Sequence, residues 1–270
     1  MGGPPKQIHL RGTSICPLAY TTDNREGRGM NSSEARRYAR VAGVLVILSI
    51  FAGGFGESFV PGKLIAAGDF HETGVRVASS LGLFRAGFFA YTIEAACDLA
   101  LTAIFYLLLR PVSRPLALIS AFFGLFGTAT FAVGEIFYYV AALPLMDAHF
   151  AGSLSPDART RFAYLCLKLY GTVFNMFTGF YGIDVMLRGY LFFRSGYFPR
   201  VLGGLLLLGG AGFVLKNLCV VLAPQYDSML LVLPNFVAMI GMAVWLSIKG
   251  IDQNRWNRVR AHNREVQEQA

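Results

Sequence analysis

The sequence contains few charged residues for its length. Charged residues make up 15% of the chain, whereas a soluble globular domain carries about 25%. Hydrophobic residues make up 54%, and the mean hydropathy is +0.50. This composition excludes an ordinary soluble domain and favours a protein that exposes most of its surface to lipid.

Cysteine and histidine are also scarce. The cysteines form no CxxC pair, so no disulfide framework or zinc site is predicted; they are Cys16, Cys97, Cys166 and Cys219. His71–Glu72 and Asp147–His149 match no known ligand spacing, and we interpret them as solvated loop residues. The motifs of zinc proteases, serine hydrolases and P-loop NTPases are absent. No metal, no cofactor and no known catalytic motif is therefore predicted.

Long apolar runs are what the sequence has in abundance. Each is long enough to cross the ~30 Å hydrocarbon core of a bilayer as a helix. The runs extend over about 38–60, 83–109, 116–143, 161–191, 201–223 and 228–248. They predict an all-α, polytopic membrane bundle of six transmembrane helices, with the lipid bilayer as its main partner.

Basic residues indicate the orientation of this bundle. Lys and Arg concentrate before residue 41, in the turns around 110–114 and 194–200, and after residue 248, and far fewer lie in the other loops. By the positive-inside rule, both termini are predicted to be cytoplasmic. The net charge of +8 thus reflects membrane topology, and no nucleic-acid partner is predicted.

Both ends of the chain differ in composition from the apolar region. Residues 1–35 are rich in Gly, Pro and polar residues and are predicted to be a disordered cytoplasmic tail, whose end at 31–34 resembles a helix capping box. Residues 36–250 form the predicted transmembrane domain. Residues 251–270 form a basic cytoplasmic tail with Trp256, which either contacts anionic lipid headgroups or is a solvated charged segment.

The second apolar run is the one around which we expect the bundle to be organised. Glu94 and Asp98 lie inside it, although an ionisable side chain at such a depth costs roughly 2.5–3.5 kcal/mol on insertion scales. At about 100° per residue, Tyr91, Glu94, Asp98 and Thr102 share one stripe of the helix. The other helices must cover this stripe, because lipid cannot solvate it.

Further charged and amide side chains lie in the outer halves of the predicted spans. Three acids there could pair with three bases, because buried charges persist when they are paired. The full set is Glu57, Arg85, Glu94, Asp98, Glu135, Lys168, Asn175, Lys216 and Asn217. We predict that it forms a polar cluster or cavity open to the outer face. The alternative is an ion network that only fixes how the helices pack.

Several segments resemble a bacterial membrane family catalogued as domain of unknown function 4386. The resemblance rests on residues 42–69, 83–85, 97–98, 108–118 and 189–208. Its most specific part runs from Glu57 through Lys63 to Asp69, and Arg85, Asp98 and Arg194 also match. The resemblance implies a six-helix, multi-pass protein of the bacterial plasma (inner) membrane, and it implies no activity.

Three functions are compatible with these residues. The first is a transporter- or sensor-like protein that binds a small polar or amphipathic ligand in the polar cluster. The second is an intramembrane enzyme that acts on a lipid or isoprenoid, with Glu94 or Glu135 as general acid or base. The third is an accessory membrane protein whose buried charges are merely paired. We favour the first, since no nucleophile or metal motif supports an enzyme. The oligomeric state is not apparent from the sequence.

Overall fold

The computed structural model describes residues 30–66, 69–146, 152 and 154–268. The chain divides into two units, Met1–Asn31 and Ser32–Ala270, and the fold below is that of the described residues of the second. The predicted disorder of the N-terminal tail falls almost entirely outside the described residues. Within those residues the chain is helical and contains no strand, which confirms the all-α fold class.

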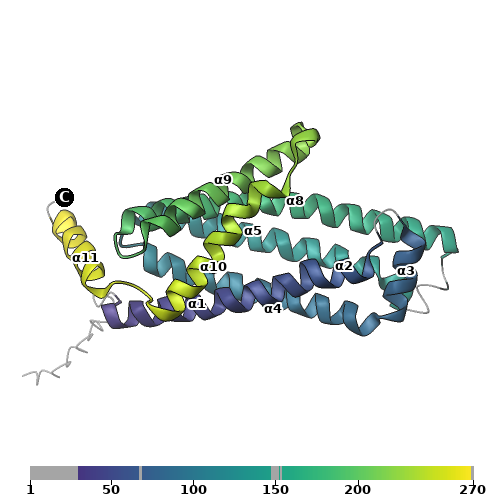
Figure 1. Cartoon of the computed structure of the whole chain (residues 1–270), viewed down its shortest axis with the longest axis horizontal. Coiled ribbons are helices and arrows are strands. Elements are labelled where there is room, and N and C mark those ends of the chain that lie inside the picture. Colours follow the sequence, from purple (N-terminus) through teal and green to yellow (C-terminus); the bar gives the residue numbers. More distant parts are fainter. Residues whose placement is uncertain (1–29, 67–68, 147–151, 153, 269–270) are drawn as a thin grey trace, which may run out of the picture. The chain divides into compact units, whose positions relative to one another are not determined.

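The described residues of this second unit include six long helical segments (Figure 1). The first begins directly after Asn31 and is continuous through three elements, α1 (Ser32–Gly53), the π-helix η1 (Gly54–Phe59) and α2 (Val60–Leu64). The others are α4 (Leu81–Leu109), α5 (Arg114–Ala141), α8 (Pro156–Ser195), α9 (Arg200–Leu222), and η3 (Met229–Val232) leading into α10 (Leu233–Ile248). The shorter elements are α3 (Phe70–Ser79), α6 (Leu143–Met146), η2 (Pro224–Tyr226) and α11 (Gln253–Glu268).

Five of the described helical segments are long and apolar enough to cross a membrane. They are Ser32–Leu64, Leu81–Leu109, Arg114–Ala141, Arg200–Leu222 and Met229–Ile248. The remaining long helix, α8, has 40 residues and is less apolar, since it carries Asp184 and Arg188 well inside its length. Each of the six predicted runs therefore coincides with a long helix, and five of these helices meet the length and composition of a span.

Neighbouring helices run antiparallel, as the residues that face one another show. Along the seam between the first segment and α4, Gly53 faces Glu94, Gly56 faces Tyr91, and Gly87 faces Val60, so residue numbers rise on one helix while they fall on the other. On α8 the same holds towards both neighbours. Along α5, Gly124 faces Asp184 and Gly134 faces Val173, and along α9, Gly203 faces Phe193 and Gly210 faces Met186. Helix α8 is thus a full-length member of the bundle between α5 and α9.

The two ends of this unit are built differently. At one end, hereafter the α3 end, lie α3, α6 and the start of α8; at the other, the α11 end, lie the start of α1, the end of α10 and α11 (Figure 1). Helix α8 begins after Ser155, whose side chain accepts a hydrogen bond from the Ala158 N–H, and it carries Pro156 in its first turn; both residue types are favoured at these positions of a helix start.

The turn between α8 and α9 fixes the α11 end. Gly196 ends α8 with φ of 71°, a conformation that favours glycine. The Tyr197 hydroxyl donates to the Leu108 carbonyl at 2.6 Å, and its ring packs against Trp256 of α11 at 5.0 Å. Burial raises the pKa of Tyr197, so its hydroxyl remains a hydrogen-bond donor. Trp256, from the predicted basic tail, is 1% exposed and anchors α11 to the bundle.

Candidate functional site: a buried acidic cluster

A π-helical turn lies where the first segment meets the organising helix α4. The η1 turn spans Gly54–Phe59, and the Gly56 carbonyl accepts a hydrogen bond of 2.6 Å from the Tyr91 hydroxyl. Tyr91 is 1% exposed, so this bond is shielded from water and lipid. Short π-helical segments inside α-helices occur frequently at functional sites. The π-helical turn η1 contains Glu57, one of the predicted site residues, and changes the course of the backbone there.

Two small residues of α1 contact the acids of α4, a glycine that leaves space for Glu94 and a serine that donates a hydrogen bond to Asp98. A Cβ on Gly53 would lie 2.5 Å from an oxygen of Glu94, so only glycine allows that carboxylate to occupy the seam. One turn earlier, the Ser49 hydroxyl donates to Asp98 at 3.3 Å. The predicted stripe of Tyr91, Glu94 and Asp98 therefore does face a neighbouring helix.

The carboxylates of three helices gather at this seam. Glu57 interacts electrostatically with Asp98, Glu94 and Glu135, and Glu94 with Asp98 and Glu135. Glu135 is 4% exposed, and neither of its carboxylate oxygens has a hydrogen-bond partner in the described structure; one oxygen of Glu94 is likewise unpartnered. These four residues are called the acidic cluster below.

Aromatic rings surround the Glu135 side of the acidic cluster. Tyr138 packs against Tyr91 and Tyr170 with ring centroids at 5.8 Å and 5.5 Å, and Phe131 lies 6.1 Å from Tyr91. Tyr138 is 2% exposed, and its hydroxyl has no partner among the described residues. The electron-rich faces of such rings attract cations and stabilise no anion.

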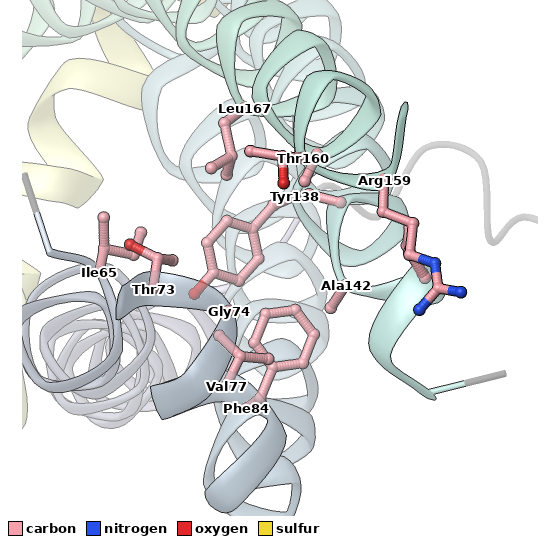
Figure 2. Close-up of a pocket in the computed structure, with 13 residues that line it drawn as sticks. Ile65, Thr73, Gly74, Val77, Phe84, Tyr138, Ala142, Arg159, Thr160 and Leu167 are labelled. Atoms are coloured by element: carbon pink, nitrogen blue, oxygen red, sulfur yellow. The ribbon is translucent and has the colours of Figure 1, made fainter. Parts of the chain in front are cut away.

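A small pocket opens at the α3 end, next to the acidic cluster. It encloses about 90 Å³ and is bounded by α3, α4, α5 and the start of α8. Figure 2 shows the Tyr138 ring among the lining residues, with Leu167 on one side of it and Phe84 and Val77 on the other. Arg159 lies at the rim, where its Nε donates to the Leu154 carbonyl at 3.1 Å, and its guanidinium points away from the rings. Tyr138 lines the pocket, and Glu135 lies three residues earlier on α5, about one helical turn deeper.

The predicted acid–base pairing does not occur among the described residues. Lys216 instead pairs with Asp227 at 2.5 Å, because α9 packs against α8 and α10 rather than α4. Lys168 lies over the Tyr164 ring at 5.4 Å, and Arg85 is exposed, since it lies about 100° around α4 from the buried Phe84. The acids were predicted to meet these bases and instead meet one another.

Asn175 and Asn217 belong to a different seam. The Asn217 amide donates to the backbone carbonyl of Asn175 at 2.5 Å, and a Cβ on Gly179 would lie 3.0 Å from Asn217. This contact joins α8 to α9 and lies apart from the acidic cluster. Of the nine predicted site residues, the structure brings together Glu57, Glu94, Asp98 and Glu135.

Sequence reasoning missed one buried ion pair. Arg188 is paired with Asp184 one turn away on α8, and the Ser120 hydroxyl donates to Asp184 at 2.5 Å. The guanidinium of Arg188 also lies 4.7 Å from the centre of the Phe105 ring and within electrostatic range of Asp98. An Asp and an Arg four residues apart inside an apolar run were the visible signal of this pair. Polar groups therefore continue from the acidic cluster towards the α11 end.

No metal centre is present among the described residues, where no group of three or more His, Cys, Asp or Glu side chains could hold an ion. Asp147 and His149, which we interpreted from the sequence as solvated loop residues, lie outside the described residues.

Comparison with known proteins places these features in a family. The model of a family described as "Domain of unknown function (DUF4386)" matches residues 41–250. The chain belongs to this family. The match confirms the resemblance seen in the sequence, and together with the apolar helices it makes this DUF4386 protein an integral membrane protein.

A curated relative carries no further information on activity. It is an uncharacterized protein from Archaeoglobus fulgidus, 24% identical over 158 residues, which cover 57% of this chain and 76% of the relative. No solved structure matches the DUF4386 protein.

Proposed function

We propose that this DUF4386 protein is a transporter- or sensor-like membrane protein that binds a small amphipathic organic cation at the acidic cluster. The observation that supports this most is the carboxylate of Glu135, which is buried beside three further acids and has no hydrogen-bond partner among the described residues. A buried charge without a partner is strongly unfavourable, so a neutralising group must come from elsewhere. A bound cation would supply it, as would a proton that the ligand displaces.

The surroundings favour an organic cation over an inorganic one. The rings of Tyr91, Phe131, Tyr138 and Tyr170 offer faces and edges around the Glu135 side of the cluster, in the manner of the aromatic cages that hold quaternary ammonium groups. The pocket beyond Tyr138 has mainly apolar walls, which would accommodate an alkyl substituent. A hydrated metal ion would instead need a set of oxygen ligands around one point.

In this proposal the ligand would enter at the α3 end and cross the Tyr138 ring. Its cationic group would then lie between Glu135 and the carboxylates at the α1–α4 seam. The Tyr91–Gly56 hydrogen bond would couple occupancy of this site to the π-helical turn at Glu57. A change in that turn is the step by which a sensor or transporter would respond.

We further propose that α8 is a sixth span, which would place both termini on the cytoplasmic side of a prokaryotic plasma membrane. The antiparallel packing of α8 against α5 and α9 supports this, and an even number of spans returns the chain to its starting side. Its charges at depth are mutually paired through Asp184 and Arg188. Short basic turns at the α11 end follow the positive-inside rule.

Reporter fusions test this topology. Chains truncated after Leu154 and after Tyr197 would carry either alkaline phosphatase, which is active outside the cytoplasm, or a fluorescent protein, which folds inside it. We expect phosphatase activity at the first site and fluorescence at the second, and fluorescence also from a fusion to the full chain. If both truncation sites report the same side, α8 does not cross the membrane.

Glu135→Gln tests the binding site. We expect the purified parent to melt at a higher temperature when choline is added, and no change with dimethylbutanol, an uncharged alcohol of similar shape. The variant should lose the response to choline while its own melting temperature stays equal or rises, because an unpartnered charge has been removed.

Glu72→Gln is the matched control, since Glu72 is a half-exposed acid of α3 paired with Arg76. It should keep the choline response and change the stability by less than about 0.5 kcal/mol. A parent that ignores choline, combined with a clear fall in melting temperature for Glu135→Gln, would show that the acids serve the fold alone.

A further inference from the structure

A second polar feature lies at the α11 end, on the lipid-facing side of α1. Arg36, Arg37 and Arg40 line one side of an open groove of about 460 Å³, and Val41 and Val44 continue it along the helix. Gln253, at the start of α11, closes the groove, and its side-chain amide donates to the Ser32 carbonyl at 3.4 Å. This groove is separate from the acidic cluster and does not depend on the function proposed for it.

The groove carries three positive charges on α1. None of the ion pairs within the described part of the chain involves Arg36, Arg37 or Arg40. The Nε of Arg36 is moreover buried and has no hydrogen-bond partner among the described residues. Three guanidinium groups within two helical turns therefore offer a set of donors that suits a phosphate, since guanidinium geometry allows paired hydrogen bonds to phosphate oxygens.

The backbone holds these arginines in place. Gly250 has φ of 69°, and a Cβ there would lie 3.1 Å from the side chain of Arg36 and 3.6 Å from that of Arg40. The turn after α10 thus packs directly on the aliphatic stems of two arginines. Packing of the stems reduces the rotamer freedom that binding would otherwise remove.

The apolar part of the groove distinguishes a lipid from a soluble anion. Val41 and Val44 are 44% and 60% exposed, and both lie on the membrane side of the arginines along α1. A ligand that contacts both parts must carry a phosphate at one end and alkyl chains at the other. The arginines would lie at the depth of the headgroups, where long basic side chains extend towards the interface.

We infer that this groove binds the headgroup of an anionic phospholipid, with the glycerol and upper acyl chains along Val41 and Val44. Each arginine near an anionic headgroup contributes about fivefold to affinity. Because the groove joins the start of α1 to the start of α11, the lipid would also hold α11 against the bundle.

The experiment is a titration of the detergent-purified full chain with phosphatidylglycerol, phosphatidylcholine or inorganic phosphate, read by melting temperature and by lipid retention in native mass spectrometry. We expect phosphatidylglycerol alone to be retained and to raise the melting temperature. Arg37→Gln together with Arg40→Gln should weaken its binding on the order of 25-fold, and the corresponding double change to Lys should preserve most of it. Both residues are exposed, so the fold should tolerate either change.

Arg110→Gln together with Arg114→Gln is the matched control, because it removes the same charge from the turn between α4 and α5 at the same end. It should leave phosphatidylglycerol binding within about twofold of the parent. Equal binding of phosphatidylcholine, equal stabilisation by phosphate alone, or equal losses in the two double variants would each overturn the inference.

Discussion

Arg188→Met is expected to destabilise the DUF4386 protein by about 3–5 kcal/mol, the usual cost of removing one partner of a buried ion pair. Arg188 and Asp184 are almost fully buried, and their side chains are 9% and 1% exposed. Removing the guanidinium leaves the Asp184 carboxylate with the Ser120 hydroxyl alone. The measurement is the melting temperature in detergent, together with the fraction that remains monodisperse on size exclusion.

Two further variants separate the ion pair from the bulk of the side chain. Asp184→Asn combined with Arg188→Met should recover most of the loss, because Asn can still accept the hydrogen bond from Ser120 and carries no charge. Arg194→Met, an exposed arginine at the end of the same helix, should cost less than about 1 kcal/mol. If the double variant melts no higher than Arg188→Met, packing of the guanidinium on Phe105 is what stabilises the site.

Gly203→Leu should separate α8 from α9 and cost at least about 3 kcal/mol, the upper end of the range for overpacking. A Cβ on Gly203 would lie 2.6 Å from the backbone nitrogen of Phe193 and 2.9 Å from the carbonyl oxygen of Gly189. Backbone atoms in a helix cannot move aside independently, so the whole interface must open. Close contact through small residues is what holds helices together in lipid, where the hydrophobic effect does not act between them.

The adjacent glycine provides the control. A Cβ on Gly204 would meet nothing within 4 Å, so Gly204→Leu should leave stability unchanged or improve it by up to about 1 kcal/mol through helix propensity. Both variants add the same side chain at neighbouring positions and differ only in the face of α9 that carries it. A similar fall in melting temperature for both would contradict the close approach of α8 and α9 described above.

The helices could be predicted from the sequence because a span has a strong and local signal. The run predicted over 83–109 corresponds to α4 at Leu81–Leu109, and the start of α8 at Ser155 and Pro156 follows from capping preferences alone. The π-helical turn at Gly54–Phe59 has no comparable signal, because the hydrogen-bond shift that defines it depends on packing against α4. Local pattern thus predicts where helices lie, and tertiary packing decides their irregularities.

The acids of the candidate site could be predicted from the sequence, but the side chains that they contact could not. Rise per residue gives the depth of Glu94, Glu135 and Lys216 along their helices, and these depths are similar. Depth does not say which helices are neighbours, and α9 proves to pack against α8 and α10, so Lys216 pairs with Asp227. The Asp184–Arg188 pair, by contrast, lies on one helix and could have been read from its spacing.

The continuous helix α8 has a mechanical consequence. One helix lines the pocket with Thr160 and Leu167 and carries the Asp184–Arg188 pair about 40 Å beyond the first of these residues, at ~1.5 Å per residue. Helix α8 is continuous from Thr160 to Arg188. A stiff rod of this length behaves as a lever, so a tilt of a few degrees about its middle would displace its two ends by ångströms in opposite directions. Events at the α3 end would thereby shift charged groups towards the α11 end without any rearrangement of the helix itself.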